Sequence, residues 1–329
     1  MTAFLEVRNL DVSFVLPRSI SSILLRNKAP GLDVLQNVSL TLGKGETLGL
    51  VGESGSGKTT LARTITGLIP PQSGTISLGG RVVSGNKDKA FHWLRREISM
   101  MFQDPIASLS PRMRIGSLIT EPFIINDISI GNRWEKAEEL LDMVGLPTEF
   151  ANRYPHELSG GQARRVGVAR ALALLPKIVI ADEPTAGLDV SVQGEILNLM
   201  TRLQEELDLS YIIVTHNLAV VRHTTTQLAI MYLGQIVEQG PTDDIFERPS
   251  HPYTKALLDS EPHPDPAKRR DDLQIKGEIP SLFLRPTGCD FHTRCSFAQD
   301  KCRAVEPDFM TTEDGRLLRC HFPLQDTDG

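Results

Sequence analysis

The sequence predicts an α/β fold in which a mostly parallel sheet carries helices on both faces. Strand-like and helix-like segments alternate along the first 240 residues with short connections. A short apolar strand at 47–51 leads directly into a glycine-rich turn, and a second apolar run at 178–181 ends in two acidic residues. Buried parallel strands have such apolar runs, and the residues that follow them lie at the ligand-binding edge of the sheet.

The first half of the chain follows this pattern element by element. Apolar and polar residues alternate at 5–14 and at 38–42, which predicts two strands. The segment between them, 16–33, is long for a connecting loop and is interpreted as an elaboration. Further elements are expected as a helix at 58–68, short strands around a helix near Phe91 at 75–102, and helices at 115–125, 133–144 and 162–175.

The second half continues with a helix between two apolar strands. Apolar residues recur at helical spacing from 192 to 207, between the strands at 178–181 and 211–214. The composition then changes, because ten of the 21 prolines lie after residue 240. We therefore expect a domain at 1–250 with a helical subdomain at about 105–175, and a C-terminal extension at 251–329.

The overall composition excludes several classes of protein. The formal net charge is −6, whereas a protein that coats nucleic acid would carry a strong basic excess. Hydrophobic residues make up 40% and charged residues 23%, which excludes wholesale disorder. The sequence has no run of 18 apolar residues, so no transmembrane helix is predicted. The N-terminal segment lacks a signal-peptide core, and we therefore expect a cytoplasmic protein.

Residues 52–59 carry a specific chemical signal. They fit the pattern G-x-x-x-x-G-K-[ST], in which glycines let successive backbone N–H groups point at one anion and the following helix adds its N-terminal dipole. Lys58 would reach the β- and γ-phosphates of a nucleotide, and the Thr59 hydroxyl would bind Mg²⁺. The predicted nucleotide contacts are Gly52, Glu53, Ser54, Gly55, Ser56, Gly57, Lys58, Thr59 and Thr60.

Polar residues that follow other strands complete a candidate catalytic site. Asp182 would hold Mg²⁺, and Glu183 would polarise the attacking water. His216 would hydrogen-bond the γ-phosphate, and Gln103 would orient water and contact Mg²⁺. Each also has a purely structural interpretation: the two acids as a helix N-cap, His216 as a satisfied polar residue and Gln103 as a surface amide.

The order of these motifs resembles that of the nucleotide-binding subunits of ABC transporters. Residues 158–162 read Leu-Ser-Gly-Gly-Gln and precede a basic helix, as the signature of that family does, and the similarity covers about residues 4–245. The resemblance implies an ATP-hydrolysing enzyme with a P-loop NTPase fold of ABC type. That fold has an antiparallel β subdomain and a helical subdomain, here followed by a small cysteine-containing extension.

The resemblance also implies roles in a head-to-tail dimer. The signature of one subunit covers the γ-phosphate bound by the other, so the contacts in trans would come from Ser159, Gly160, Gly161 and Gln162. Asp189 would lie at the dimer seam, and Phe14 is the nearest match to the aromatic residue that stacks on adenine.

Segments of the C-terminal half narrow the resemblance. Residues 251–258, 276–281 and 288–295 are similar to the extension of dipeptide, oligopeptide and nickel importer ATPases, and 101–112 resembles the F-type member of their ATPase pair. This implies import of di- or oligopeptides, with nickel or another small solute as the alternative cargo. The implied partners are a paralogous ATPase in a heterodimer, two permease subunits and an extracytoplasmic substrate-binding protein, at the cytoplasmic face of a bacterial inner membrane.

The four cysteines all lie in the extension, at Cys289, Cys295, Cys302 and Cys320. They lack the paired C-x2-C spacing of zinc ribbons, and structural disulfides are not expected in a reducing cytoplasm. In several members of the resembled subfamily this region carries a [4Fe–4S] cluster, which four thiolates would suit. Zn²⁺, with a nearby His292 or His321 as a ligand, and unligated thiols stay open. A staple for a small domain is favoured over a redox catalyst.

Two other functions are weighed against the importer. Soluble ABC ATPases that act on ribosomes or DNA usually carry two cassettes or long coiled-coil insertions, whereas this sequence shows one cassette and no heptad run. An exporter ATPase would not be expected to carry the C-terminal extension. The sequence therefore favours a transport motor of the import type.

Overall fold

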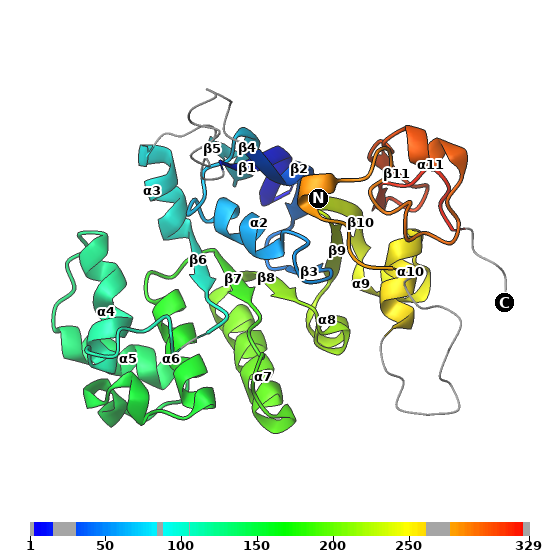
Figure 1. Ribbon diagram of the computed structural model, residues 1–329. Helices are drawn as coiled ribbons and strands as arrows, with labels where there is room; N and C mark the ends of the chain where they lie inside the picture. Colours follow the sequence, from blue (N-terminus) through cyan, green and yellow to red (C-terminus); the bar gives the residue numbers. More distant parts are fainter. Residues whose placement is uncertain (1–2, 16–30, 84–87, 105, 261–276, 325–329) are drawn as a thin grey trace, which may run out of the picture. The chain divides into compact units, whose positions relative to one another are not determined.

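A computed structural model describes residues 3–15, 31–83, 88–104, 106–260 and 277–324 (Figure 1). The chain folds into two compact units. Of the described residues, the first unit contains 43–47, 88–104 and 106–215, and the second contains 3–15, 31–42, 48–83, 216–260 and 277–324. Most of the predicted long loop at 16–33 lies outside the described residues.

Parallel strands form the sheet of the first unit: β6 (Ile98–Met101), β7 (Ile178–Asp182) and β8 (Ser210–Thr215). Every residue of β7 and β8 is buried, which explains their largely apolar runs. The helical segments of this unit are α3 (Asp88–Glu97), α4 (Ile115–Ile125), α5 (Arg133–Met143), η1 (Thr148–Asn152), η2 (Pro155–Glu157), α6 (Gly160–Leu172) and α7 (Val190–Leu207).

One hydrophobic core joins the helices of the first unit to its sheet. Leu140 of α5, Val166 of α6 and Ile196 of α7 are fully buried in it. Val179 of β7 and Ile213 of β8 belong to the same cluster. Burial of such aliphatic side chains stabilises the fold by about 1.5–3 kcal/mol each, so this core fixes the ends of β7 and β8 where the acidic pair lies.

The second unit contains an antiparallel sheet with the order β2-β1-β4-β5. Its strands are β1 (Leu5–Val15), β2 (Gly31–Leu42), β4 (Ser73–Leu78) and β5 (Arg81–Val83). A further set of strands comprises β3 (Thr47–Val51), β9 (Gln227–Tyr232), β10 (Gln235–Pro241), β11 (Met310–Thr311) and β12 (Leu317–Leu318). The helical segments are α2 (Lys58–Ile65), α8 (Leu218–Thr224), α9 (Thr242–Glu247), α10 (Pro252–Asp259), η4 (Leu282–Leu284) and α11 (Asp300–Ala304).

The C-terminal extension is joined to the second unit through β10. Residues 48–51 of β3 pair in parallel with β9, whereas β9, β10, β12 and β11 pair antiparallel in that order. Leu318 lies opposite both Glu238 and Met310. The extension therefore adds two short strands next to the strand that precedes it.

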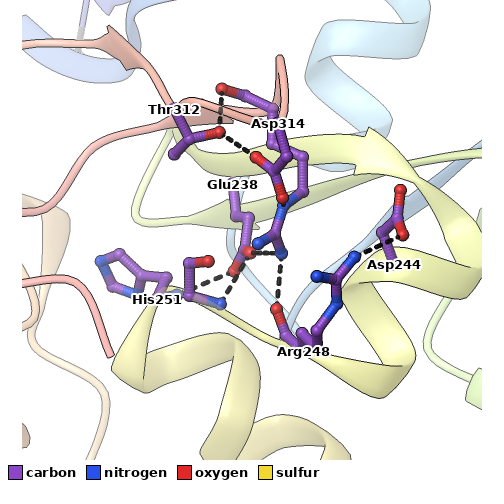
Figure 2. A network of polar contacts seen from close by, with 8 residues as sticks. Glu238, Asp244, Arg248, His251, Thr312 and Asp314 are labelled. Carbon is purple, nitrogen blue, oxygen red and sulfur yellow. Dashed lines mark hydrogen bonds and ion pairs between the residues drawn. The ribbon is translucent and has the colours of Figure 1, made fainter. Parts of the chain in front are cut away.

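A buried glutamate fixes the segment where the extension begins (Figure 2). Glu238 has no exposed surface, and its carboxylate accepts hydrogen bonds from the backbone N–H groups of Ser250 and His251, both at 2.9 Å. Arg316 donates to the same carboxylate at 3.3 Å and also to the carbonyl oxygen of Arg248. Burial raises the pKa of Glu238, and these donors oppose that shift by stabilising the charged form.

The predicted elements are confirmed, with differences at their ends. The helix expected at 162–175 spans Gly160–Leu172, and the helix expected at 58–68 ends at Ile65. Among the described residues, no helix combines the length and apolar character that crossing a membrane requires. The boundary at 250 stays a prediction.

Candidate functional site

The glycine-rich turn lies in the second unit between β3 and α2. Gly55 and Gly57 have φ angles of 80° and 99°, a region that residues with a Cβ rarely adopt. A Cβ at Gly52 would lie 2.1 Å from the carbonyl oxygen of Met231, so only glycine fits there. The backbone therefore curls tightly from Gly52 to the start of α2, as the motif predicts.

Lys58 places its ammonium group inside this curl. Its Nζ donates to the carbonyl oxygens of Gly52 and Glu53 at 2.7 and 2.8 Å and lies 3.3 Å from the Ser56 hydroxyl. The residue is only 8% exposed. A buried cation at a helix N-terminus attracts a phosphate group, and Thr59 follows on the first turn of α2.

The acidic pair lies at the end of β7 in the first unit. Asp182 is the last residue of that strand and is 4% exposed. Glu183 follows with a left-handed φ of 50°, which a non-glycine residue adopts only when its surroundings hold it. The Glu183 N–H donates to the carbonyl oxygen of Val214 at 2.8 Å, and the Glu183 carboxylate accepts from the Thr215 hydroxyl at 3.1 Å. These bonds hold the carboxylate at the C-terminal edge of the sheet.

Arg164 is a residue of this edge that the sequence analysis did not single out. Its guanidinium donates to the carbonyl oxygen of Gln103 at 2.8 Å and to that of Ala186 at 2.9 Å. Burial lowers its pKa, whereas Asp104 and Glu183 raise it by charge attraction. Arg164 therefore links the segment that carries Gln103 to the turn after Glu183, while the Gln103 side chain is exposed.

The signature residues begin helix α6. The Ser159 hydroxyl accepts from the Gln162 N–H at 3.3 Å, and the Gln162 side chain accepts from the Ser159 N–H at 3.0 Å, which makes a capping box. Asp189 caps α7 by accepting from Val192 at 2.9 Å. Ser159, Gly160, Gly161, Gln162 and Asp189 all line one open pocket of the first unit.

His216 and Phe14 belong to the second unit. His216 is exposed and precedes Asn217, which caps α8. Phe14 lies on β1 opposite Leu32 and is 39% exposed. Their assigned roles, hydrogen bonding to the γ-phosphate and stacking on adenine, stay predictions.

The four cysteines line a single small pocket in the second unit. Cys289, Cys295, Cys302 and Cys320 are free thiols, and the pocket walls include Phe291, Phe297 and Phe322. The pKa of Cys289 is raised to about 12 and that of Cys320 to about 11, mainly by burial and to a smaller extent by the neighbouring thiols. Within the described part of the chain, no group of three or more His, Cys, Asp or Glu residues has the arrangement of a metal site.

The two histidines considered as ligands each contact a carbonyl oxygen. His292 Nδ1 lies 2.9 Å from the oxygen of Cys289, and His321 Nε2 lies 2.8 Å from that of Val305. One ring nitrogen of each is thus engaged outside the thiol set. The pocket lining therefore combines four sulfur atoms with aromatic rings and with the histidines His251, His292 and His321.

Comparison with known proteins gives this chain clear relatives. Residues 35–186 match the ABC transporter family, and residues 237–302 match the oligopeptide/dipeptide transporter C-terminal region. The chain is 47% identical to a probable peptide ABC transporter ATP-binding protein, y4tS, of Sinorhizobium fredii, over 90% of this chain and 84% of that protein. It is 44% identical to the oligopeptide transport ATP-binding protein AppF of Bacillus subtilis, over 97% of both chains.

Two solved structures share the fold. One is cbiO1 from Clostridium perfringens, part of the ABC transporter complex cbiONQ, with a TM-score of 0.62 and 27% identity over 74% of this chain and 91% of that one. The other is the dimeric ATP-binding cassette MJ0796 bound to ADP and Pi, with a TM-score of 0.63 and 28% identity over 72% of this chain and 98% of that one.

Proposed function

The chain belongs to the ABC transporter ATPases with an oligopeptide/dipeptide-type C-terminal region, and from that premise we propose that it is the ATP-hydrolysing subunit of a di- or oligopeptide importer. The observation that carries the proposal is the presence in one chain of a complete phosphate loop and this C-terminal region, matched over 97% of its length by an oligopeptide transport ATP-binding protein. Neither the nucleic-acid nor the exporter alternative accounts for the extension.

In the roles that their motifs predict, the following residues divide the chemistry of ATP hydrolysis between them. Lys58 and the N–H groups of the loop bind the β- and γ-phosphates. Thr59, Asp182 and Gln103 offer the hydroxyl, carboxylate and amide oxygens that Mg²⁺ prefers, and the ion would neutralise charge on the phosphates. Glu183 polarises the attacking water, and His216 hydrogen-bonds the γ-phosphate. The protein thus acts by positioning and charge neutralisation rather than by covalent chemistry.

The pocket lined by the signature residues supports a dimer. The N-terminus of α6 contributes Ser159 and Gly160 to it, and helix N-termini attract phosphate oxygens. We infer that it covers the γ-phosphate held by the phosphate loop of a paralogous ATPase subunit. The pair would act on two permease subunits, fed by a substrate-binding protein, at the cytoplasmic face of the inner membrane.

The cysteine pocket supports a [4Fe–4S] cluster as a second proposal. Its four thiols line one small space together with the aromatic rings of Phe291, Phe297 and Phe322. Bound there, a cluster would supply covalent links between segments that are distant in the sequence. Its role would be to stabilise the extension.

Transport by the assembled complex tests the function. The chain would be expressed with the permease, partner ATPase and binding-protein genes that neighbour its own and reconstituted in lipid vesicles. We expect ATP-dependent uptake of labelled di- or oligopeptides that is lost when Lys58→Ala replaces the wild-type chain. Uptake of nickel but not of peptides would contradict the proposed peptide cargo. Assembly of the ATPase into a complex that lacks permease subunits would contradict its role as a transport motor.

A further inference from the structure

Glu53, the second residue of the phosphate loop, is held by the C-terminal extension. The guanidinium of Arg294 donates to both carboxylate oxygens of Glu53, at 2.7 and 2.9 Å. The hydroxyl of Tyr253 accepts from the Glu53 N–H at 3.0 Å. The Glu53 carbonyl oxygen accepts from Lys58. The residue that contacts this lysine is therefore tied, at its side chain and at its amide, to residues 200 or more positions away.

The groups that hold Glu53 are themselves fixed by aromatic packing. The rings of Tyr232, Tyr253 and Phe291 contact one another with centroid distances of 4.7 to 5.3 Å. Arg294 lies 5.8 Å from the Tyr232 ring and contacts the Tyr232 hydroxyl at 3.4 Å. Aromatic contacts of this kind are rigid, so the guanidinium is presented to the loop in a defined orientation.

The ion pair has an electrostatic consequence for nucleotide binding. The Arg294 side chain is 5% exposed and that of Glu53 is 21% exposed, so solvent screens the pair weakly. Without Arg294, an unneutralised carboxylate would stand in a loop that must accept a polyphosphate. Like charges in a partly buried site repel strongly. An arginine that binds both oxygens of a carboxylate neutralises its charge more effectively than a single hydrogen bond does.

We propose that Arg294 is a positioning residue for the phosphate loop: it neutralises and orients Glu53, so that the C-terminal extension sets the affinity of the loop for ATP. This inference rests on the proposed ATPase function. It assigns to the extension a direct effect on nucleotide binding, in addition to any contribution to stability.

The variant Arg294→Met tests the proposal, with Arg319→Met as the matched control. Arg319 is also buried, with a side chain 5% exposed, also precedes a cysteine of the pocket, and pairs with Glu306 at 3.0 Å. We expect Arg294→Met to raise the KM for ATP about tenfold with kcat changed less than about twofold, and Arg319→Met to leave KM within about twofold. Both would be measured in the assembled transporter, with affinity for a fluorescent ATP analogue measured on the full chain.

A second substitution separates the electrostatic role from a general loss of structure. Glu53→Gln removes the negative charge, so the double variant Arg294→Met/Glu53→Gln should recover a KM within about threefold of wild type. A structural defect would be as large or larger in the double variant. A double variant no better than Arg294→Met, or an equal rise of KM in Arg319→Met, would overturn the inference.

The outcomes also separate this inference from the function on which it rests. A wild-type chain that neither binds nor hydrolyses ATP in the assembled complex would overturn the proposed function. A wild-type chain that hydrolyses ATP, together with an Arg294→Met variant of unchanged KM, would overturn only the role of Arg294.

Discussion

The chemistry at the scale of single residues depends on where Glu183 points. Its carboxylate accepts from Thr215 at 3.1 Å, and a glutamine oxygen can accept the same bond, so Glu183→Gln should preserve the local structure. Loss of the base should slow ATP hydrolysis by about 100-fold or more while ATP affinity changes less than about threefold. Steady-state turnover of the purified complex checks this. Glu121→Gln, which alters an acid paired with Arg170 at 2.7 Å, is the control expected to keep normal turnover.

Near-normal turnover of Glu183→Gln would show that another residue polarises the attacking water.

The sequence could locate Glu183 and the phosphate loop because each motif is confined to a few consecutive residues next to an apolar strand. It could not locate Arg164 or Arg294, because their partners lie 61 and 241 positions away, and such contacts form only when the chain folds. Their roles had no local pattern in the sequence.

At the scale of elements, the two signature glycines differ in what a methyl group would meet. A Cβ at Gly161 would lie 2.8 Å from Val192 Cγ1, which would push α6 from α7, whereas a Cβ at Gly160 would lie 3.4 Å from Leu188 Cδ2. Gly161→Ala should therefore lower the free energy of unfolding by about 1–3 kcal/mol, and Gly160→Ala by less than about 0.5 kcal/mol. Denaturant titration of both variants measures the difference. Equal losses would contradict it, and Val192→Ala should restore stability to Gly161→Ala.

The cap of α10 predicts how stability depends on pH. His251 Nδ1 accepts from the Tyr253 N–H at 3.0 Å, and burial lowers the pKa of His251 to about 3. Because an unfolded histidine binds a proton below about pH 6.5, the unfolded state holds more protons between pH 6.5 and 3, and stability falls as the pH falls through that window. We expect protonation of His251 in the unfolded state to lower the free energy of unfolding by up to about 1.4 kcal/mol for each pH unit.

The variant His251→Asn isolates this contribution. Asparagine can cap the helix but does not titrate, so the free energy of unfolding should depend less steeply on pH between 6.5 and 4. Denaturant titrations of the full chain at several pH values give both slopes. Identical slopes for the wild type and the variant would show that His251 is protonated without cost in the folded protein.

The sequence predicted β7 and β8 but not β9 or β10, nor the two-residue strands β11 and β12. β7 and β8 are continuous buried runs, so their positions follow from the residues alone. β11 and β12 have two residues each and exist because β10 offers them partners. Two residues carry no periodicity, and the pairing that defines them is set by the fold.

At the scale of the whole molecule, the extension acts on the rest of the second unit at several points. Glu238 of β10 binds the segment that leads into α10, β12 pairs with β10, and Arg294 pairs with the phosphate loop. These contacts join the extension to the unit that holds the loop, and the domain boundary at 250 stays a prediction. A change in the extension should therefore reach the nucleotide site without passing through other subunits.

The cysteine pocket connects segments from several parts of the extension. Its lining joins Cys289 and Cys302 to Cys320 and to the start of α10, so a cluster there would tie together most of the extension. The full chain purified without oxygen should contain about four iron and four sulfide ions per chain, and Cys302→Ala should lose most of the iron and melt at a lower temperature. His292→Ala is the control expected to keep its iron, because four thiolates complete the ligand set of a [4Fe–4S] cluster without a histidine. Stoichiometric zinc with no sulfide, or equal melting temperatures for Cys302→Ala and the wild type, would contradict the iron–sulfur staple.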